Sequence, residues 1–183
     1  MDETVRKVFH MFNGILIAGI IYFLEPIFFQ FLCLGVAPFL FYLRSRVKNN
    51  KKSTLTDFCL KHLGRKNDVG DGALYYLLGC FIVSLIFEKN IAALSILVLG
   101  ISDGFATIVG IHGTHKIFKK KTLEGSTAFF ISTLIIVSFF YNFWIGLIAS
   151  LIITPVELFS FVDDNLSIPI IFSITIKLIT QFL

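Results

Sequence analysis

Residues 91–126, IAALSILVLGISDGFATIVGIHGTHKIFKKKTLEGS, decide the fold class. Up to residue 111 the stretch is apolar apart from Asp103 and a few small hydroxyl side chains, and it is long enough for a membrane helix, which takes about 20 residues. A charge at that depth is costly, so Asp103 is expected to face a partner or a polar cavity. The basic, glycine-bearing segment that follows, together with this carboxylate, is typical of a site for Mg²⁺ and phosphate.

The composition extends this interpretation to the whole chain. Of its 183 residues, 56% are hydrophobic and 22 are Phe, and the mean hydropathy is +0.84. A soluble domain of this length could not bury so much apolar surface. The runs do not alternate as β-barrel strands would, so we expect one all-α, polytopic membrane domain over residues 1–183 in the lipid bilayer, with no nucleic-acid partner. Three scattered cysteines are expected to be free thiols rather than metal ligands or disulfides: Cys33, Cys59 and Cys80.

The apolar runs predict about seven transmembrane helices. Glu25-Pro26 and Glu88-Lys89-Asn90 divide neighbouring runs, and Tyr141-Asn142 divides a run that is too long for one helix. The expected spans are residues 8–24, 27–43, 73–87, 91–111, two within 127–161, and 167–183.

Basic residues in the connections predict the orientation. Residues 44–66 hold eight Lys and Arg, residues 112–124 hold four and the N-terminus holds two, whereas the short turns hold only Lys89. By the positive-inside rule the N-terminus and the basic connections are cytoplasmic and the C-terminus is outside. Lys177 lies within the last span and is expected to extend toward the outer interface.

The first polar motif lies near the N-terminus. Lys7, His10 and Gly14 fall three and four residues apart, so they share one helix face, and Arg6 precedes them. Gly14 allows a neighbouring helix to approach closely. The group is either a basic anchor at the membrane surface or part of a site.

The second motif surrounds Asp103. With Ala106 and Gly110 it forms one narrow face of a helix, which leaves room for a cation or a headgroup unless the carboxylate makes an interhelical contact instead. In residues 122–126, Thr122 or Ser126 can cap the next helix. A helix N-terminus is also an anion site, so capping and phosphate binding are compatible here.

The third motif consists of carboxylates near the C-terminus. Glu157 and Asp164 are seven residues apart and share a face if the helix continues that far. Together with Asp163 they either bind a cation or form a turn and a helix cap.

Taken in order, these motifs resemble the CTP-dependent polyprenol kinase family, which includes dolichol kinase, phytol kinase and the yeast-type CTP-dependent diacylglycerol kinase. The resemblance is carried by four segments: RKVFH (6–10), GALYYLLG (72–79), DGFATIVGIHG with KKKTLEGS (103–113 and 119–126), and DDNLSIP (163–169). The family more often has Gly-Lys directly after the second glycine of the long motif, where this chain has Thr114-His115-Lys116. Whether Lys116 or a later lysine meets phosphate is therefore left open.

The resemblance implies a kinase that moves the γ-phosphate of CTP to the hydroxyl of a membrane lipid alcohol, with dolichol or polyprenol favoured and phytol or diacylglycerol possible. Asp103, Lys7 and His10 would be catalytic, and Mg²⁺ would be bound by Asp103, Asp163 and Asp164. The nucleoside triphosphate would be bound by Arg6, Gly110, Gly113, Lys116, Lys119, Lys120, Lys121, Glu124, Gly125 and Ser126.

Two alternatives stay open, namely a cytidylyltransferase that makes a CDP-lipid and a small transporter or flippase. The site is expected to face the cytoplasm, from the endoplasmic reticulum of a eukaryote or the plasma membrane of a prokaryote.

Overall fold

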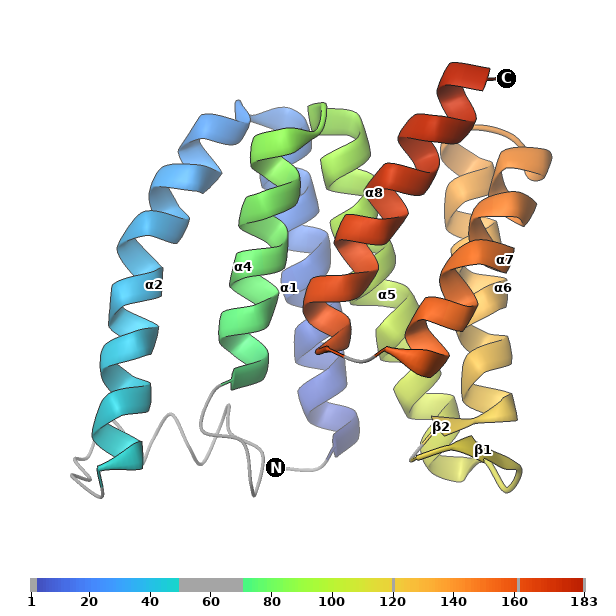
Figure 1. Cartoon of the computed structure of the whole chain (residues 1–183), viewed down its shortest axis with the longest axis horizontal. Helices are drawn as coiled ribbons and strands as arrows, with labels where there is room; N and C mark the ends of the chain where they lie inside the picture. Colours follow the sequence, from blue (N-terminus) through green and yellow to red (C-terminus); the bar gives the residue numbers. More distant parts are fainter. Residues whose placement is uncertain (1–2, 50–70, 120, 161, 183) are drawn as a thin grey trace.

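A computed structural model describes residues 3–49, 71–119, 121–160 and 162–182, and it confirms the all-α class (Figure 1). Within these residues there are seven helices and one small antiparallel hairpin. The helices are α1 (Glu3–Phe23), α2 (Pro26–Lys48), α4 (Asp71–Ile86), α5 (Lys89–His112), α6 (Leu123–Phe140), α7 (Phe143–Phe159) and α8 (Asp164–Phe182). The hairpin consists of β1 (Lys116–Phe118) and β2 (Lys121–Thr122).

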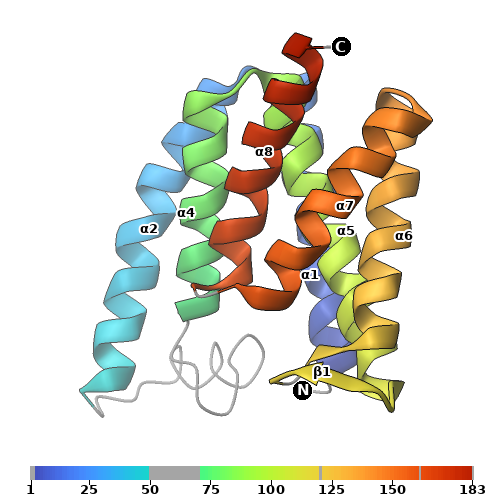
Figure 2. The ribbon, with the colours of Figure 1, turned by 45° about the vertical axis from the view of Figure 1, so that its right-hand side comes forward.

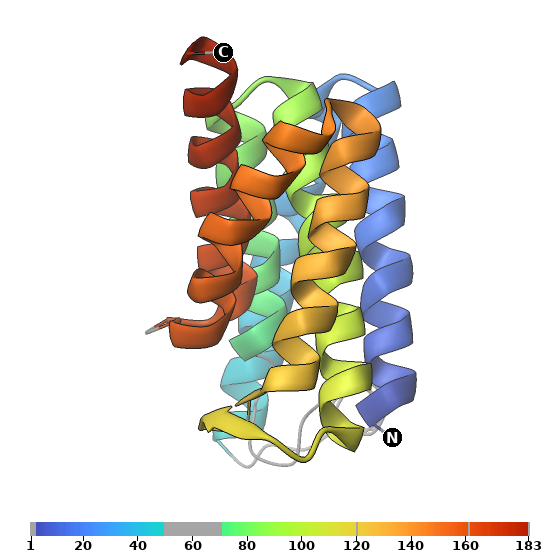
Figure 3. The same cartoon turned by 90° about the vertical axis from the view of Figure 1, so that its right-hand side faces the viewer.

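The helices form one bundle with two distinct ends (Figures 1 and 2). The start of α1, the end of α5 and the hairpin lie at one end, which we call the basic end; the α1–α2, α4–α5 and α6–α7 turns lie at the other, the far end. Figure 3 shows the hairpin beneath α5 and α6. Lys177 of α8 lies 5.8 Å over the Phe87 ring at the far end, in the direction that the sequence predicts.

Five of the described helices, α1, α2, α5, α6 and α8, are long and apolar enough to cross a membrane. The protein is therefore an integral membrane protein. α4 and α7 are apolar but have only 16 and 17 residues, so the prediction that they also cross the membrane stays a prediction. Large apolar side chains such as Phe31 and Phe139 are exposed on the outside of the bundle, where lipid would surround them.

α5 lies in the middle of the bundle, and glycines bring α1 close to it. A Cβ on Gly14 would lie 2.7 Å from the Cα of Gly100, so neither position has room for a side chain. The predicted close approach at Gly14 is confirmed. Because Lys7 and His10 share this face of α1, the same contact directs them toward α5.

α6 packs on the opposite side of α5. A Cβ on Gly125 would lie 2.7 Å from the carbonyl oxygen of Ala106 and 3.1 Å from the Cα of Gly110. The narrow face of α5 that was expected to leave room for a ligand is therefore filled, near Ala106 and Gly110, by the backbone of α6. Only the Asp103 end of that face belongs to a polar site.

α8 begins three residues earlier than the predicted start at Ser167, because Asp163 caps it. The Oδ1 atom of Asp163 accepts a hydrogen bond of 3.0 Å from the backbone N–H of Asn165. Pro169 has no N–H to give the carbonyl of Asn165, and a Cβ on Gly79 of α4 would lie 2.4 Å from that oxygen. Gly79 thus lets α4 pack directly on the start of α8.

The core lies in two clusters. One joins α5, α6, α7 and α8 around Leu99, Phe129, Ile153 and Phe172. The other joins α1, α2, α4 and α5, and it includes Cys33 and Cys80, which are free as predicted. Cys59 lies outside the described residues.

Candidate active site

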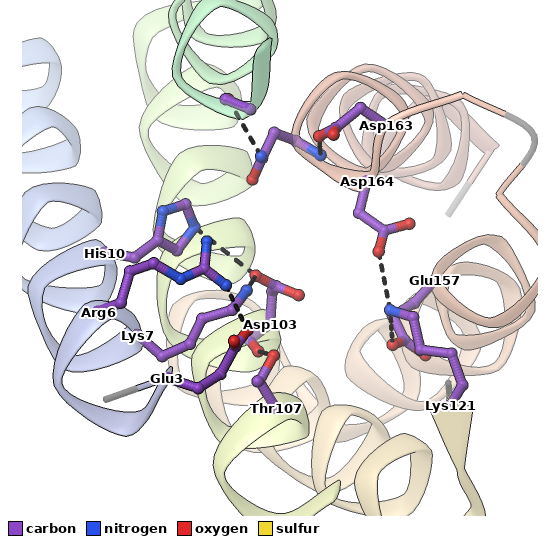
Figure 4. Close-up of polar contacts among 12 residues, drawn as sticks. Glu3, Arg6, Lys7, His10, Asp103, Thr107, Lys121, Glu157, Asp163 and Asp164 are labelled. Carbon is purple, nitrogen blue, oxygen red and sulfur yellow. Dashed lines mark hydrogen bonds and ion pairs between the residues drawn. The ribbon is translucent and has the colours of Figure 1, made fainter. Parts of the chain in front are cut away.

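Asp103 is the centre of a charged group near the basic end (Figure 4). It is 3% exposed, and its Oδ2 atom forms an ion pair with the Lys7 ammonium of α1. The Nε2 atom of His10 lies 3.7 Å from the same oxygen. The prediction that Lys7 and His10 share a face is confirmed, and that face meets the carboxylate.

His10 lies between α5 and α4. Its ring packs edge-on against Tyr76 of α4, with 4.8 Å between ring centroids. Its Nε2 atom is buried without a hydrogen-bond partner among the described residues, because 3.7 Å from Asp103 is too long for a hydrogen bond. Buried polar atoms are nearly always bonded, so this nitrogen can accept or donate a bond when another polar group enters.

A second charged group is built around Lys121 of β2. Its ammonium forms an ion pair with Oε1 of Glu157 in α7 and lies 2.8 Å from Oδ2 of Asp164 in α8. Glu157 is 1% exposed, and its Oε2 atom accepts a hydrogen bond of 3.3 Å from the Ser126 hydroxyl of α6. Two carboxylates from different helices therefore share one lysine.

The charges around Lys121 determine its protonation. Burial by itself lowers the pKa of Lys121, but the Asp164 and Glu157 carboxylates, with a smaller contribution from Asp103, raise the pKa above the ordinary lysine value. Lys121 therefore stays charged at neutral pH. The contribution of Asp103 shows that the two charged groups are near enough to act on each other.

Glu157 and Asp164 meet for a different reason from the one predicted. The helix does not continue from Glu157 to Asp164, because α7 ends at Phe159 and α8 begins at Asp164. The chain reverses between the two helices, and the carboxylates face each other from neighbouring elements. The shared-face argument is wrong, although the two side chains do come together.

Asp163 and Asp164 point in different directions, as Figure 4 shows. The carboxylate of Asp163 caps α8, whereas that of Asp164 reaches Lys121. Among the described residues, no group of three or more His, Cys, Asp or Glu side chains is arranged to hold a metal ion. The predicted role of Asp163 as a metal ligand stays a prediction, and its geometry supports capping.

The basic segment after α5 forms the hairpin rather than an open loop. Lys119 adopts a positive φ of 50° in its turn, and Phe118 packs on Phe159 of α7 with 5.4 Å between ring centroids. Lys116 and Lys119 are exposed, while Lys121 points inward. Lys120 lies outside the described residues.

The start of α6 holds the hairpin against α5. Thr122 is its N-cap and accepts a hydrogen bond of 3.2 Å from the backbone of Gly125, which confirms one of the two predicted caps. Glu124 accepts bonds from the backbone N–H groups of Thr114 and His115, at 3.1 and 3.3 Å. A Cβ on Gly113 would lie 2.6 Å from the Thr122 hydroxyl oxygen.

These contacts give a packing or turn role to several residues predicted to bind the nucleotide. Gly110, Gly113, Glu124 and Gly125 join α5, the hairpin and α6, and their contact with a nucleotide stays a prediction. Arg6 pairs with Glu3 on its own helix, 2.5 Å away, rather than with Asp103.

Sequence reasoning did not include three residues that the structure adds to the site. Glu157 carries a recognisable signal, because it is a carboxylate in an apolar run, as Asp103 is. Asn165 donates a hydrogen bond of 3.2 Å to the carbonyl of Gly72 and so joins α8 to α4. Tyr76 has no signal in the sequence that separates it from other aromatic residues.

The fold and the site define an α-helical integral membrane protein with buried carboxylate–lysine pairs near one end. The chain is 34% identical to an uncharacterised protein of Methanocaldococcus jannaschii, over 97% of this chain and 94% of that protein. It therefore belongs to the same family as that protein. No family model and no solved structure matches the chain.

Two more distant relatives are named as kinases. The chain is 29% identical to a probable chloroplastic phytol kinase of Triticum aestivum over 58% of its length, and 29% identical to CTP-dependent diacylglycerol kinase 1 of Eremothecium gossypii over 66%. It spans only 43% and 48% of these two proteins. Both matches support the kinase family that the motifs resemble.

Proposed function

We propose that the protein is a CTP-dependent lipid kinase that transfers the γ-phosphate of CTP to the hydroxyl of a membrane lipid alcohol. The observation that carries this proposal is the pairing of buried Asp103 with Lys7, beside a second group in which Lys121 is shared by Glu157 and Asp164. The similarity to two lipid kinases supports the reaction class.

Phosphoryl transfer depends on positioning and charge neutralisation more than on covalent chemistry. The lipid hydroxyl oxygen forms a bond to the γ-phosphorus, the bond to the leaving CDP oxygen breaks, and the hydroxyl proton must leave. In this proposal Asp103 orients the hydroxyl and accepts its proton, and Lys7 fixes the carboxylate. The unpaired Nε2 atom of His10 is placed to bond the same hydroxyl or a phosphate oxygen.

The second charged group fits a divalent cation. Glu157 and Asp164 carry one more charge than the Lys121 ammonium balances. Mg²⁺ is usually bound by one or two carboxylates together with substrate phosphates, so a larger ligand cluster is not required. Asp164 and Glu157 would hold the ion, with Asp103 nearby, and it would neutralise charge on the phosphates. Exposed Lys116 and Lys119 are then available to the triphosphate.

The finer assignment follows the motif resemblance. We propose a dolichol- or polyprenol-type alcohol as the preferred acceptor, with phytol and diacylglycerol as further candidates. The basic connections support a site that faces the cytoplasm, from the endoplasmic reticulum of a eukaryote or the plasma membrane of a prokaryote. The charges lie near one end of the bundle rather than at its midplane, which disfavours a transporter.

A direct assay tests this function. Purified protein in lipid nanodiscs is incubated with CTP labelled at the γ-phosphate, with Mg²⁺ and, in turn, dolichol, undecaprenol, phytol or diacylglycerol. We expect a labelled lipid phosphate and release of CDP. Release of pyrophosphate with a CDP-lipid would establish a cytidylyltransferase instead, and no product with any alcohol would overturn the proposal.

A further inference from the structure

A groove runs between α2 and α4, which lie side by side at the edge of the bundle (Figures 1 and 2). Its volume is about 400 Å³, within the range of about 300–1,000 Å³ for small-molecule sites. Its walls are mainly apolar and include Cys33, Leu34 and Ala37 of α2 and Leu74, Leu78 and Phe81 of α4. Because the groove lies in the membrane-spanning part of the bundle, its occupant has to come from the bilayer.

The charged residues of the groove lie together at the basic end. Arg44, near the end of α2, pairs with Asp71, the first residue of α4, at 2.6 Å. Beyond this pair the lining is apolar toward the far end. The groove therefore matches an amphiphile that has an apolar chain and one polar end.

The charge of that pair indicates which polar end fits. Arg44 and Asp71 balance each other, so together they offer hydrogen-bond donors and acceptors without net charge. A neutral hydroxyl can bond to both residues. An anionic phospholipid headgroup would instead be repelled by the Asp71 carboxylate.

The groove is also continuous with the candidate active site through α4. Gly72, next to Asp71, accepts a hydrogen bond from Asn165, and Asn165 follows Asp164. One turn further along α4, Tyr76 packs on His10. α4 is thus a shared wall, with the groove on one face and the site on another, and both open toward the basic end.

We propose that the α2–α4 groove binds the hydrocarbon chain of a single-chain lipid alcohol, with its hydroxyl at Arg44 and Asp71. This inference rests on the proposed kinase function and adds the place where the acceptor is held. One narrow groove favours an alcohol with one chain, such as a polyprenol or phytol, over a diacylglycerol.

Photolabelling tests the groove without requiring catalysis. The full chain in nanodiscs is irradiated with a long-chain primary alcohol that carries a diazirine on its chain, and labelled peptides are mapped by mass spectrometry. We expect adducts in α2 and α4. Excess phytol should suppress them at least fivefold, whereas the same amount of diacylglycerol or phosphatidylglycerol should change them less than twofold.

Two substitutions on α2 provide a matched pair. Ala37→Trp places a large ring in the groove and should reduce labelling at least fivefold. Gly35→Trp adds the same ring where a Cβ meets nothing within 4 Å, and labelling should be unchanged. Asp71→Asn leaves Arg44 without its balancing charge, so phosphatidylglycerol should then compete with the alcohol.

The outcomes separate this inference from the kinase proposal. Equal competition by phosphatidylglycerol in the unsubstituted protein would mean that the groove holds bulk lipid, and the inference would be overturned even if Ala37→Trp did not fold. Equal labelling of the two tryptophan variants would overturn it as well. Alcohol-specific labelling without any phosphoryl transfer from CTP would overturn the kinase function and leave the binding site standing.

Discussion

Replacing Lys7 by Met should destabilise the protein more than replacing Asp103 by Asn. Lys7→Met leaves the Asp103 carboxylate, 3% exposed, without its ion-pair partner. Removing one member of a buried pair costs about 3–5 kcal/mol, because the other charge stays buried and uncompensated. Asp103 is in the middle of α5 and its short side chain cannot reach water.

Asp103→Asn has a different consequence, because Lys7 lies in the second turn of α1, near the basic end. Its long side chain can extend toward the membrane surface once the carboxylate is gone. We therefore expect a smaller cost, of about 1–3 kcal/mol for an unmade polar contact. The double variant Lys7→Met/Asp103→Asn should recover much of the loss of Lys7→Met, since it contains no unpaired charge.

Unfolding of the four proteins in mixed micelles by increasing SDS measures these differences, and the double-mutant cycle gives the coupling energy. Phosphoryl transfer is measured on the same samples. All three variants should lose transfer, including the stable double variant. Equal free energies of unfolding for the two single variants would refute the asymmetry argument, and normal transfer by folded Asp103→Asn would remove Asp103 from the reaction.

Four further predictions concern the cap, the helix crossing, the donor and the topology. Asp163→Ala should lower stability by about 0.5–2 kcal/mol as a lost cap, with little change in turnover, while Asp164→Ala should cut turnover and raise the Mg²⁺ concentration needed for half-maximal rate; identical Mg²⁺ titrations would contradict this. Gly14→Leu should separate α1 from α5 at a cost of about 1–3 kcal/mol and abolish transfer, whereas Gly19→Leu, where a Cβ meets nothing within 4 Å, should be silent in thermal unfolding and in transfer. CTP should support faster transfer than ATP, and excess EDTA should stop the reaction; full activity in EDTA would exclude the metal. A cysteine in place of Leu55 should be labelled only from the cytoplasmic side of sealed vesicles, and labelling from outside would reverse the predicted orientation.

The fold class was predictable because its signal is long and repeated along the chain. Each apolar run is bounded by a charge, proline or asparagine, so the helix limits at Glu25-Pro26 and Tyr141-Asn142 are close to those predicted. The start of α8 was missed because the cap of Asp163 competes with the usual preference of proline for a first turn. The hairpin was missed because residues 116–122 are too few and too basic to give a strand pattern.

The candidate site was only partly predictable, since pairing across helices is not encoded in local spacing. Lys7, His10 and Asp103 each stand out as polar residues in apolar helices, yet their contact depends on the packing of Gly14 against Gly100. Glycines in the Asp103 motif illustrate the same difficulty. A glycine near a basic segment is compatible with phosphate contact, but Gly110 lies against the α6 backbone, and only the tertiary structure shows this contact.

The placement of the glycines explains how the chain retains buried charges that reduce its stability. A buried ion pair contributes little net stability and often less than an apolar replacement would, so the Lys7–Asp103 pair has to be held by other contacts. Backbone contact at Gly14–Gly100 and at Gly125 brings α1 and α6 directly onto α5, and packing of this kind stabilises helices in lipid. Because those contacts involve backbone atoms, they fix the distance between helices without depending on side-chain rotamers. Charged residues on the same faces are then held in place even though their own interactions would not hold the helices together, and this is the arrangement that a positioning-dependent reaction requires.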